Sequence, residues 1–130
     1  MDSTKPGHAL ARIRELVAEL AMVVLGINHQ RISDEMSVYF IANLRVHDPA
    51  LYERYLDGFD EIFSRHEGEV VAVDEAPAVL EGEWPYTRAV VIRFPDEAAL
   101  RRWYDSEAYQ QLAQIRRIAA DGFIVAVRGE

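Results

Sequence analysis

The chain has 130 residues, of which 50% are hydrophobic, so it is large enough for one domain with one packed core. Its formal net charge of −8 argues against nucleic acid and against an anionic membrane surface as partners. The lack of cysteine excludes disulfides, thiolate nucleophiles and cysteine-ligated metal centres. The first residues lack the pattern of a secretory signal, and the longest apolar run, 20–27, is too short to span a bilayer, so we expect a cytoplasmic protein.

Residues 1–37 are predicted to form a tail, an amphipathic helix and a polar linker, ahead of a main domain at residues 38–130. From His8 to about Ile27 apolar residues recur at helical spacing, with charged residues between them. The polar stretch that follows is typical of a linker. The apolar stripe of this helix consists of Leu10, Ile13, Leu16, Val17, Leu20, Val24 and Leu25.

The first half of the main domain has the pattern strand, helix, strand. Residues 38–46 alternate in the manner of a strand. A helix is predicted to begin at Asp48-Pro49, because aspartate is a good N-cap and proline is favoured at the first helical position. We expect Gly68 to end this helix, since glycine adopts the left-handed conformation common at helix C-termini, and a second strand to follow at 69–73.

The second half repeats this plan. A short extended piece at 79–82 leads through a loop to a predicted third strand at 87–94. Asp96 is placed to cap the next helix, and Ser106 is placed to restart that helix after a kink.

The last elements are predicted to be a helix at 109–120, ended by Gly122, and a strand at 123–127. The order from residue 38 onward is therefore β-α-β-β-α-β. This is the split pattern of a ferredoxin-like α+β domain, in which two helices cover one face of an antiparallel sheet.

The sheet face opposite the helices is also predicted to be apolar. Strand neighbours point to opposite faces, so Ile41, Val71, Val91 and Ile124 cannot all lie on the helix side with their neighbours. An uncovered apolar sheet is an interaction surface, and two such sheets facing each other form a symmetric barrel. We therefore predict a homodimer, a dimeric α/β barrel. The alternative is that the N-terminal helix covers this face.

Several short runs, taken together, resemble the domain-of-unknown-function family numbered 1330, within the dimeric α/β-barrel superfamily. The resemblance covers roughly residues 38–129 and implies a ferredoxin-like dimer with a cleft between sheet and helices or at the barrel mouth. It implies no reaction, since the superfamily includes cofactor-free monooxygenases, haem-dependent relatives and degradative isomerases. The runs are Tyr39-Phe40-Ile41 with Asp48-Pro49 and Tyr52…Tyr55, then Val79-Leu80-Glu81-Gly82 with Arg88-Ala89-Val90-Val91-Ile92-Arg93-Phe94-Pro95, and finally Trp103-Tyr104-Asp105-Ser106-Glu107-Ala108-Tyr109 with Arg116-Arg117-Ile118-Ala119-Ala120.

Two arginines are candidate substrate-binding residues. Arg88 heads a predicted strand, and Arg116 lies at the edge of an apolar helix stripe. A charge beside an apolar surface needs a partner, and Glu81 is the expected partner of Arg88. One interpretation is a structural arginine–glutamate cluster that joins sheet and helix. The other is a site in which an arginine binds the carboxylate of a small anionic ligand.

Three further residues complete the candidate site. Asn43 could hydrogen-bond a ligand if its sheet face lines a barrel, although an interface amide is the alternative. Glu81 and Tyr104 are the candidate catalytic residues, as groups able to move protons. Tyr104, Trp103 and Tyr109 are otherwise expected in the core. The four histidines show no ligand spacing, and we predict no metal site and no cofactor.

Two functions therefore remain open. The first is a small-molecule-binding homodimer, either a carrier or a cofactor-free enzyme that acts on a small anionic or phenolic compound. The second is a non-catalytic interaction module that docks through the N-terminal helix.

Overall fold

A computed structural model describes Ile13 and residues 37–130. Apart from Ile13, which is helical, the predicted N-terminal helix and the linker after it lie outside the described residues. The unit considered below is Ser37–Gly129.

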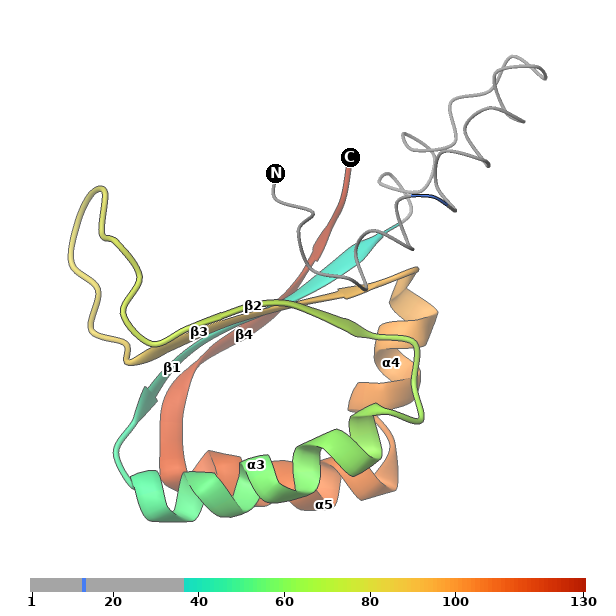
Figure 1. The fold of residues 1–130 in the computed structure, drawn as a ribbon, viewed down its shortest axis with the longest axis horizontal. Coiled ribbons are helices and arrows are strands. Elements are labelled where there is room, and N and C mark those ends of the chain that lie inside the picture. The colour runs from blue at the N-terminus through green and yellow to red at the C-terminus, as the bar shows by residue number, and fades with distance from the viewer. Residues whose placement is uncertain (1–12, 14–36) are drawn as a thin grey trace. The chain divides into compact units, whose positions relative to one another are not determined.

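The main domain has the predicted order of elements, with its second helical segment divided into two helices (Figure 1). Among the described helices, none combines the length and the apolar composition that a membrane span requires. The elements are β1 (Val38–Val46), α3 (Pro49–Phe63), β2 (Glu69–Asp74), β3 (Arg88–Phe94), α4 (Glu97–Tyr104), α5 (Glu107–Ala119) and β4 (Ala120–Arg128).

The four strands form one antiparallel sheet in the order β2-β3-β1-β4. Helices α3 and α5 lie side by side under one face of this sheet, with α4 near one end (Figure 1). The central strand β1 pairs with both neighbours, so that Ile41 lies opposite Val91 on one side and Val125 on the other. This arrangement is the predicted ferredoxin-like α+β fold.

Each helix begins where the sequence places an N-cap. The side chain of Asp48 accepts a hydrogen bond from Leu51 N at 3.1 Å, and that of Asp96 accepts one from Ala99 N at 2.8 Å. Ser106 Oγ accepts one from Tyr109 N at 3.2 Å, which confirms that it restarts the helix. These side chains satisfy amide groups that have no partner in the first turn of a helix.

The two glycines that were expected to end helices have other roles. Helix α3 ends at Phe63, with Ser64 as its C-cap, so the helix stops five residues before Gly68. A Cβ atom at Gly68 would lie 2.6 Å from the Phe63 ring and 2.8 Å from the Phe94 ring, so glycine makes room for these aromatic side chains. Helix α5 ends at Ala119, and β4 begins at the next residue without a loop.

Gly122 therefore lies inside β4, where it is paired with Leu44 of β1. Its φ is 155°, and a Cβ atom built there would lie 1.9 Å from the backbone oxygen of Asn43. Glycine at this position allows β4 to approach β1 closely.

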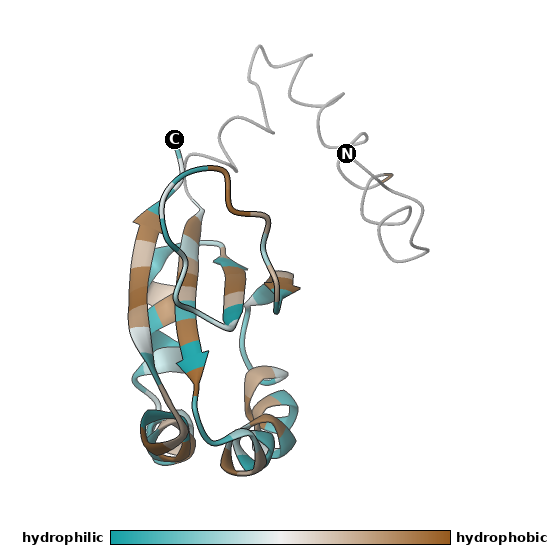
Figure 2. Ribbon diagram, turned by 90° about the vertical axis from the view of Figure 1, so that its left-hand side faces the viewer, coloured by the Kyte–Doolittle hydropathy of each residue, from teal (hydrophilic) through white to brown (hydrophobic). Residues whose placement is uncertain are grey.

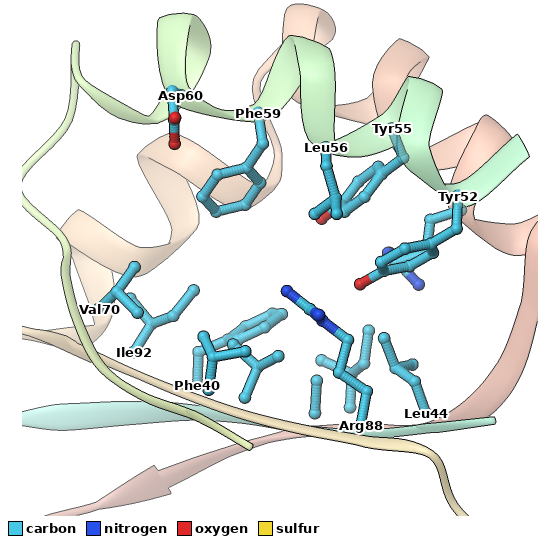
Figure 3. Close-up of a pocket in the computed structure, with 15 residues that line it drawn as sticks. Phe40, Leu44, Tyr52, Tyr55, Leu56, Phe59, Asp60, Val70, Arg88 and Ile92 are labelled. Atoms are coloured by element: carbon cyan, nitrogen blue, oxygen red, sulfur yellow. The ribbon is translucent and has the colours of Figure 1, made fainter. Parts of the chain in front are cut away.

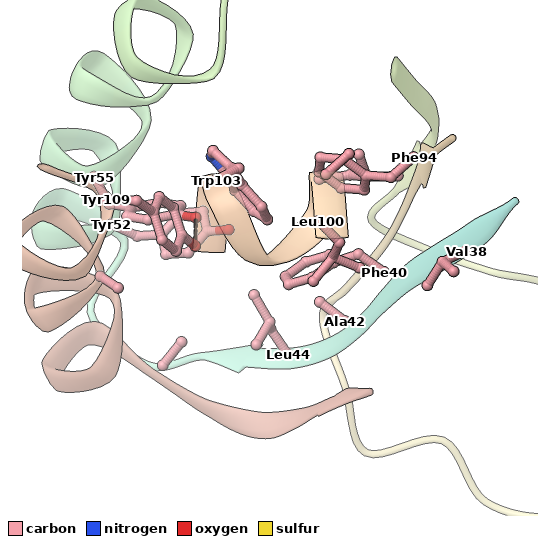
Figure 4. Packing of buried hydrophobic residues seen from close by; sticks show 14 of the residues in the cluster. Val38, Phe40, Ala42, Leu44, Tyr52, Tyr55, Phe94, Leu100, Trp103 and Tyr109 are labelled. Atoms are coloured by element: carbon pink, nitrogen blue, oxygen red, sulfur yellow. Dashed lines mark hydrogen bonds between the residues drawn. The ribbon is translucent and has the colours of Figure 1, made fainter. Parts of the chain in front are cut away.

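The core lies between the sheet and the helices (Figure 4). Trp103, Tyr109 and Phe94 are each 0% exposed, as expected for the first two. The Trp103 ring lies 4.3 Å from that of Tyr109 and 5.1 Å from that of Phe40, measured between centroids. Aromatic side chains of this size contribute most of the apolar area buried by a small domain.

The opposite sheet face carries apolar side chains, and no described helix covers it. Hydrophobic and hydrophilic bands alternate along the strands (Figure 2). On β4 the exposed fractions of Phe123, Val125 and Val127 are 67%, 52% and 43%. The prediction for Ile124 is wrong: it pairs with Ala42 on the helix-facing side, because each face of a strand takes every second residue.

Candidate functional site

A cavity of about 270 Å³ lies between the helix-facing side of the sheet and helices α3 and α5 (Figure 3). Its volume is close to the lower end of the range for small-molecule sites, about 300–1,000 Å³. Most of its wall is apolar. The lining residues are Phe40, Ala42, Leu44, Tyr52, Tyr55, Leu56, Phe59, Asp60, Val70, Val73, Arg88, Val90, Ile92, Arg116 and Ile124.

The two cavity arginines come from opposite walls. Arg88 begins β3 and alternates with Val90 and Ile92, so its side chain points from the sheet toward the helices (Figure 3). Arg116 lies on α5, in the same buried stripe as Tyr109 and Ala113. Arg116 was predicted at the edge of that stripe, but its seven-residue spacing from Tyr109 places it inside the stripe.

Arg116 is a buried charge with an unpaired edge. The residue is only 7% exposed, and its guanidinium carbon lies 5.8 Å from the centroid of the Tyr55 ring. Its Nε and Nη2 atoms are buried without a hydrogen-bond partner in the described part of the chain. None of the ion pairs found there includes Arg116. Such a charge is costly to bury unless something pairs with it.

Arg88, in contrast, already has a carboxylate partner. Its Nη1 donates a hydrogen bond to Glu75 Oε2 at 3.1 Å, and its side chain is 15% exposed. The expected pairing with Glu81 is therefore wrong. Nε of Arg88 is buried without a partner in the described residues, and the guanidinium carbon lies 5.4 Å from the Tyr52 ring centroid.

The two tyrosines of the cavity are neutral hydroxyl groups. Burial raises the pKa of Tyr55 well above its ordinary value of 10.0, and the adjacent Tyr109 hydroxyl, 2.7 Å away, acts in the same direction. Burial also raises the pKa of Tyr52, against the opposing effect of Arg88. Both side chains can donate or accept hydrogen bonds, but neither supplies a negative charge to Arg116 near neutral pH.

The cavity lining contains one carboxylate, that of Asp60, which is exposed. In Figure 3 it lies with Val70 at the end of the cavity away from Tyr52. Val70 and Val73 of β2 line the cavity and are 44% and 47% exposed, so the cavity is open along the edge formed by β2.

Of the five candidate residues, the structure brings Arg88 and Arg116 together at the cavity. Asn43 lies on the opposite sheet face, paired with Phe123 of β4. Glu81 is exposed in the connection between β2 and β3, which has no helix or strand where an extended piece was expected. Tyr104 is half-buried, its ring 6.1 Å from that of Phe40, and is not part of the lining.

Three residues that lie beside the cavity arginines were not predicted as site residues. Tyr52 and Tyr55 were read as part of the apolar stripe of α3, and their three-residue spacing did place them on one helix face. Glu75 follows directly after β2, and no pattern in the sequence distinguished it from Glu81 as the partner of Arg88.

The described residues contain no group of three or more histidine, aspartate or glutamate side chains placed to hold a metal ion. His47 lies at the surface, as expected, with its Nε2 atom 3.7 Å from Asp121 Oδ1.

Comparison with known families identifies the domain. Residues 37–130 match the family described as "Domain of unknown function (DUF1330)". The chain belongs to this family. No curated protein matches the chain.

Similar solved structures have the same fold. A protein of unknown function from Rhodopseudomonas palustris is 17% identical, with a TM-score of 0.63 over 74% of this chain and 84% of that one. SnoaB, a cofactor-independent oxygenase from Streptomyces nogalater, is 18% identical, with a TM-score of 0.56 over 73% of this chain and 94% of that one. A dimeric ferredoxin-like protein of unknown function from Thermobifida fusca is 20% identical, with a TM-score of 0.55 over 72% of this chain and 91% of that one. At such identities the comparison establishes the fold of this DUF1330 domain, not its activity.

Proposed function

We propose that this DUF1330 domain binds a small organic anion in the cavity between its sheet and helices, with Arg116 and Arg88 as the binding residues. The observation that carries the proposal is the buried Arg116 guanidinium, whose Nε and Nη2 have no partner among the described residues. A ligand that brings a negative charge offsets the cost of burying this cation.

The structure gives a carboxylate partner to Arg88 but none to Arg116 among the described residues. A cluster that only joins sheet and helix needs a carboxylate at each guanidinium, and Glu75 supplies one to Arg88 alone. The predominantly apolar wall around Arg116 is also typical of a small-molecule site, in which a few polar groups orient a ligand.

We also propose that the protein acts as a homodimer, paired through the sheet face opposite the helices. Exposed Phe123, Val125 and Val127 on β4 support this, because a single-chain protein seldom exposes adjacent large apolar side chains on one face. The similar Thermobifida fusca protein is described as dimeric. In such a dimer Asn43 would lie at the interface.

A reaction in this cavity would use Tyr52 and Tyr55 as hydrogen-bond donors, because Glu81 and Tyr104 do not line it. Neutral phenol hydroxyls beside a guanidinium can donate hydrogen bonds to a developing oxyanion. SnoaB is described as an oxygenase that needs no cofactor, which supports small-molecule chemistry as a second candidate function on this fold.

Native mass spectrometry of the freshly purified full chain tests both proposals. The expected result is a dimer that carries a small anionic adduct, which Arg116→Gln lacks. Arg117→Gln is the matched control, since Arg117 is exposed on the same helix and loses the same charge. A monomer overturns the dimer, and an equal adduct in Arg116→Gln overturns the cavity as the anion site.

A further inference from the structure

We infer that the ligand of the cavity is a monocarboxylate with a compact apolar body, its carboxylate bound side-on by the Nε and Nη2 atoms of Arg116. This inference rests on the proposed function and adds the chemical class of the ligand. Three features of the site carry it: the shape of the unpaired arginine edge, the charge count, and the position of Asp60.

The unpaired edge of Arg116 fits a carboxylate. Nε and Nη2 lie on the same side of the guanidinium, so their N–H groups form two parallel donors. Two parallel donors match the two oxygens of a carboxylate, the bidentate arrangement that arginine favours. Both atoms are covered in the ligand-free protein and have no partner among the described residues. Arg116 lines the cavity, so a turn of its side chain would present this edge to a ligand.

The charge count favours a monoanion. The cavity has two guanidinium groups, but Arg88 donates to Glu75 at 3.1 Å and is thereby compensated. The charge of Arg116 has no such partner in the described part of the chain, so a ligand with one negative charge would balance it. A phosphate monoester could use the same arginine edge, but it carries about −1.5 to −2 charges near neutral pH, and its excess charge would lie against an apolar wall.

The position of Asp60 disfavours a second negative charge at the other end of the ligand. In Figure 3 the Arg88 side chain rises from the sheet toward Leu56 with Tyr52 beside it, while Asp60 and Val70 lie at the other end, beyond Phe59. Arg116 lies over the Tyr55 ring, and its charge opposes the rise in the pKa of Tyr52 that burial causes. The arginine therefore lies at the Tyr52 end of the cavity, opposite Asp60. A second carboxylate that extended toward Asp60 would meet a like charge.

The body of the ligand must therefore be apolar and short. Between the two ends the wall consists of Phe59 and Leu56 from α3 and Phe40, Val90 and Ile92 from the sheet. The cavity volume of about 270 Å³ admits one ring or a short branched chain rather than a fused ring system.

Calorimetric titration of the full-length protein with four matched probes tests the class. The probes are hydrocinnamate, its neutral amide hydrocinnamamide, the dianion phenyl phosphate and the dicarboxylate phenylsuccinate. Hydrocinnamate is expected to bind at least about tenfold more tightly than each of the others, because only it satisfies the arginine edge without excess charge.

Two substitutions locate the effect. Arg116→Lys keeps the charge but removes the two parallel donors, and is expected to weaken hydrocinnamate binding about tenfold, whereas the exposed control Arg117→Lys leaves it unchanged. Asp60→Asn should raise the affinity for phenylsuccinate relative to hydrocinnamate several-fold. Because Asp60 is exposed, this variant gives a second test that does not depend on a buried substitution.

The outcomes test two claims separately: that the ligand is a monocarboxylate, and that the cavity binds an anion. Tighter binding of phenyl phosphate, phenylsuccinate or the amide overturns the monocarboxylate, while a ligand lost in Arg116→Gln still supports an anion site. Absence of hydrocinnamate binding also overturns the class. An adduct that survives in Arg116→Gln overturns both.

Discussion

Replacing Arg116 with methionine should make the ligand-free protein more stable, although it removes the proposed binding group. Two buried donors without partners cost roughly 1.5 kcal/mol each. The lost contact with the Tyr55 ring, at 5.8 Å, offsets about 1 kcal/mol of this. The expected net gain for Arg116→Met is therefore about 2 kcal/mol in the free energy of unfolding, or roughly 8 °C in Tm for a domain of this size.

The assay is urea unfolding, followed by circular dichroism, of protein stripped of bound ligand by unfolding, dialysis and refolding. Native mass spectrometry verifies that each sample is free of ligand before the two curves are compared. A loss of more than about 1 kcal/mol in Arg116→Met, with an unchanged m-value, would refute the reasoning. It would mean that the guanidinium is compensated within the protein and that the arginine is a structural group.

Four further changes test the fold and its surfaces. Gly122→Ala should lower the free energy of unfolding by more than about 2 kcal/mol in urea titrations, because its Cβ would lie 1.9 Å from Asn43 O. Tyr109→Phe should lower it by about 1–2 kcal/mol, since the Tyr55 hydroxyl loses its partner at 2.7 Å. Burial raises the pKa of Tyr55, so the neutral Tyr55 hydroxyl contributes fully to the free energy of unfolding below pH 10, and this contribution is lost as the pH rises through the pKa of the folded protein. In that pH range Tyr55 is ionised in the unfolded chain but not in the folded one, so the free energy of unfolding should fall by up to about 1.4 kcal/mol per pH unit. The fall should be smaller in Tyr55→Phe. Val125→Lys, at a position 52% exposed, should give a folded monomer in light scattering. A dimer that persists in this variant would contradict pairing through β4.

Local sequence signals predicted most of the fold because they act over a few residues. The alternation at 38–46 matches β1 residue for residue, and the capping side chains of Asp48, Asp96 and Ser106 mark the helix starts. Such signals depend on backbone hydrogen bonds within one turn or on the two faces of one strand. They need no knowledge of distant contacts.

The errors concern residues whose role depends on distant neighbours. Gly68 and Gly122 resemble helix-ending glycines in the sequence. In the structure, the absence of a side chain makes room for Phe94 at Gly68 and for the backbone of Asn43 at Gly122, and both neighbours lie far away in the sequence. The choice between Glu75 and Glu81 as the partner of Arg88 depends on the path of an irregular connection, and no periodicity predicts such a path.

The candidate site was predictable only as a pair of arginines. The sequence indicated that Arg88 and Arg116 lie beside apolar surface, and the structure shows both at one cavity. The sequence did not indicate that Arg88 has Glu75 as its carboxylate partner, or that Nε and Nη2 of Arg116 have no hydrogen-bond partner among the described residues, because both depend on three-dimensional packing.

The junction between α5 and β4 has a mechanical consequence for this arginine. Ala119 ends the helix and Ala120 begins the strand, and the carbonyl oxygen of Ala119 accepts hydrogen bonds from the backbone N–H groups of His47 and Asp48 at 3.0 and 3.1 Å. No loop residues lie between Arg116's helix and the strand to absorb a displacement. The backbone of Arg116 is therefore tied to β4, and the hydrogen-bonded register of the sheet sets where the side chain of Arg116 begins. Because the backbone on which Arg116 stands is held in this way, only its side chain has to adjust to receive a ligand, which limits the entropic cost of binding.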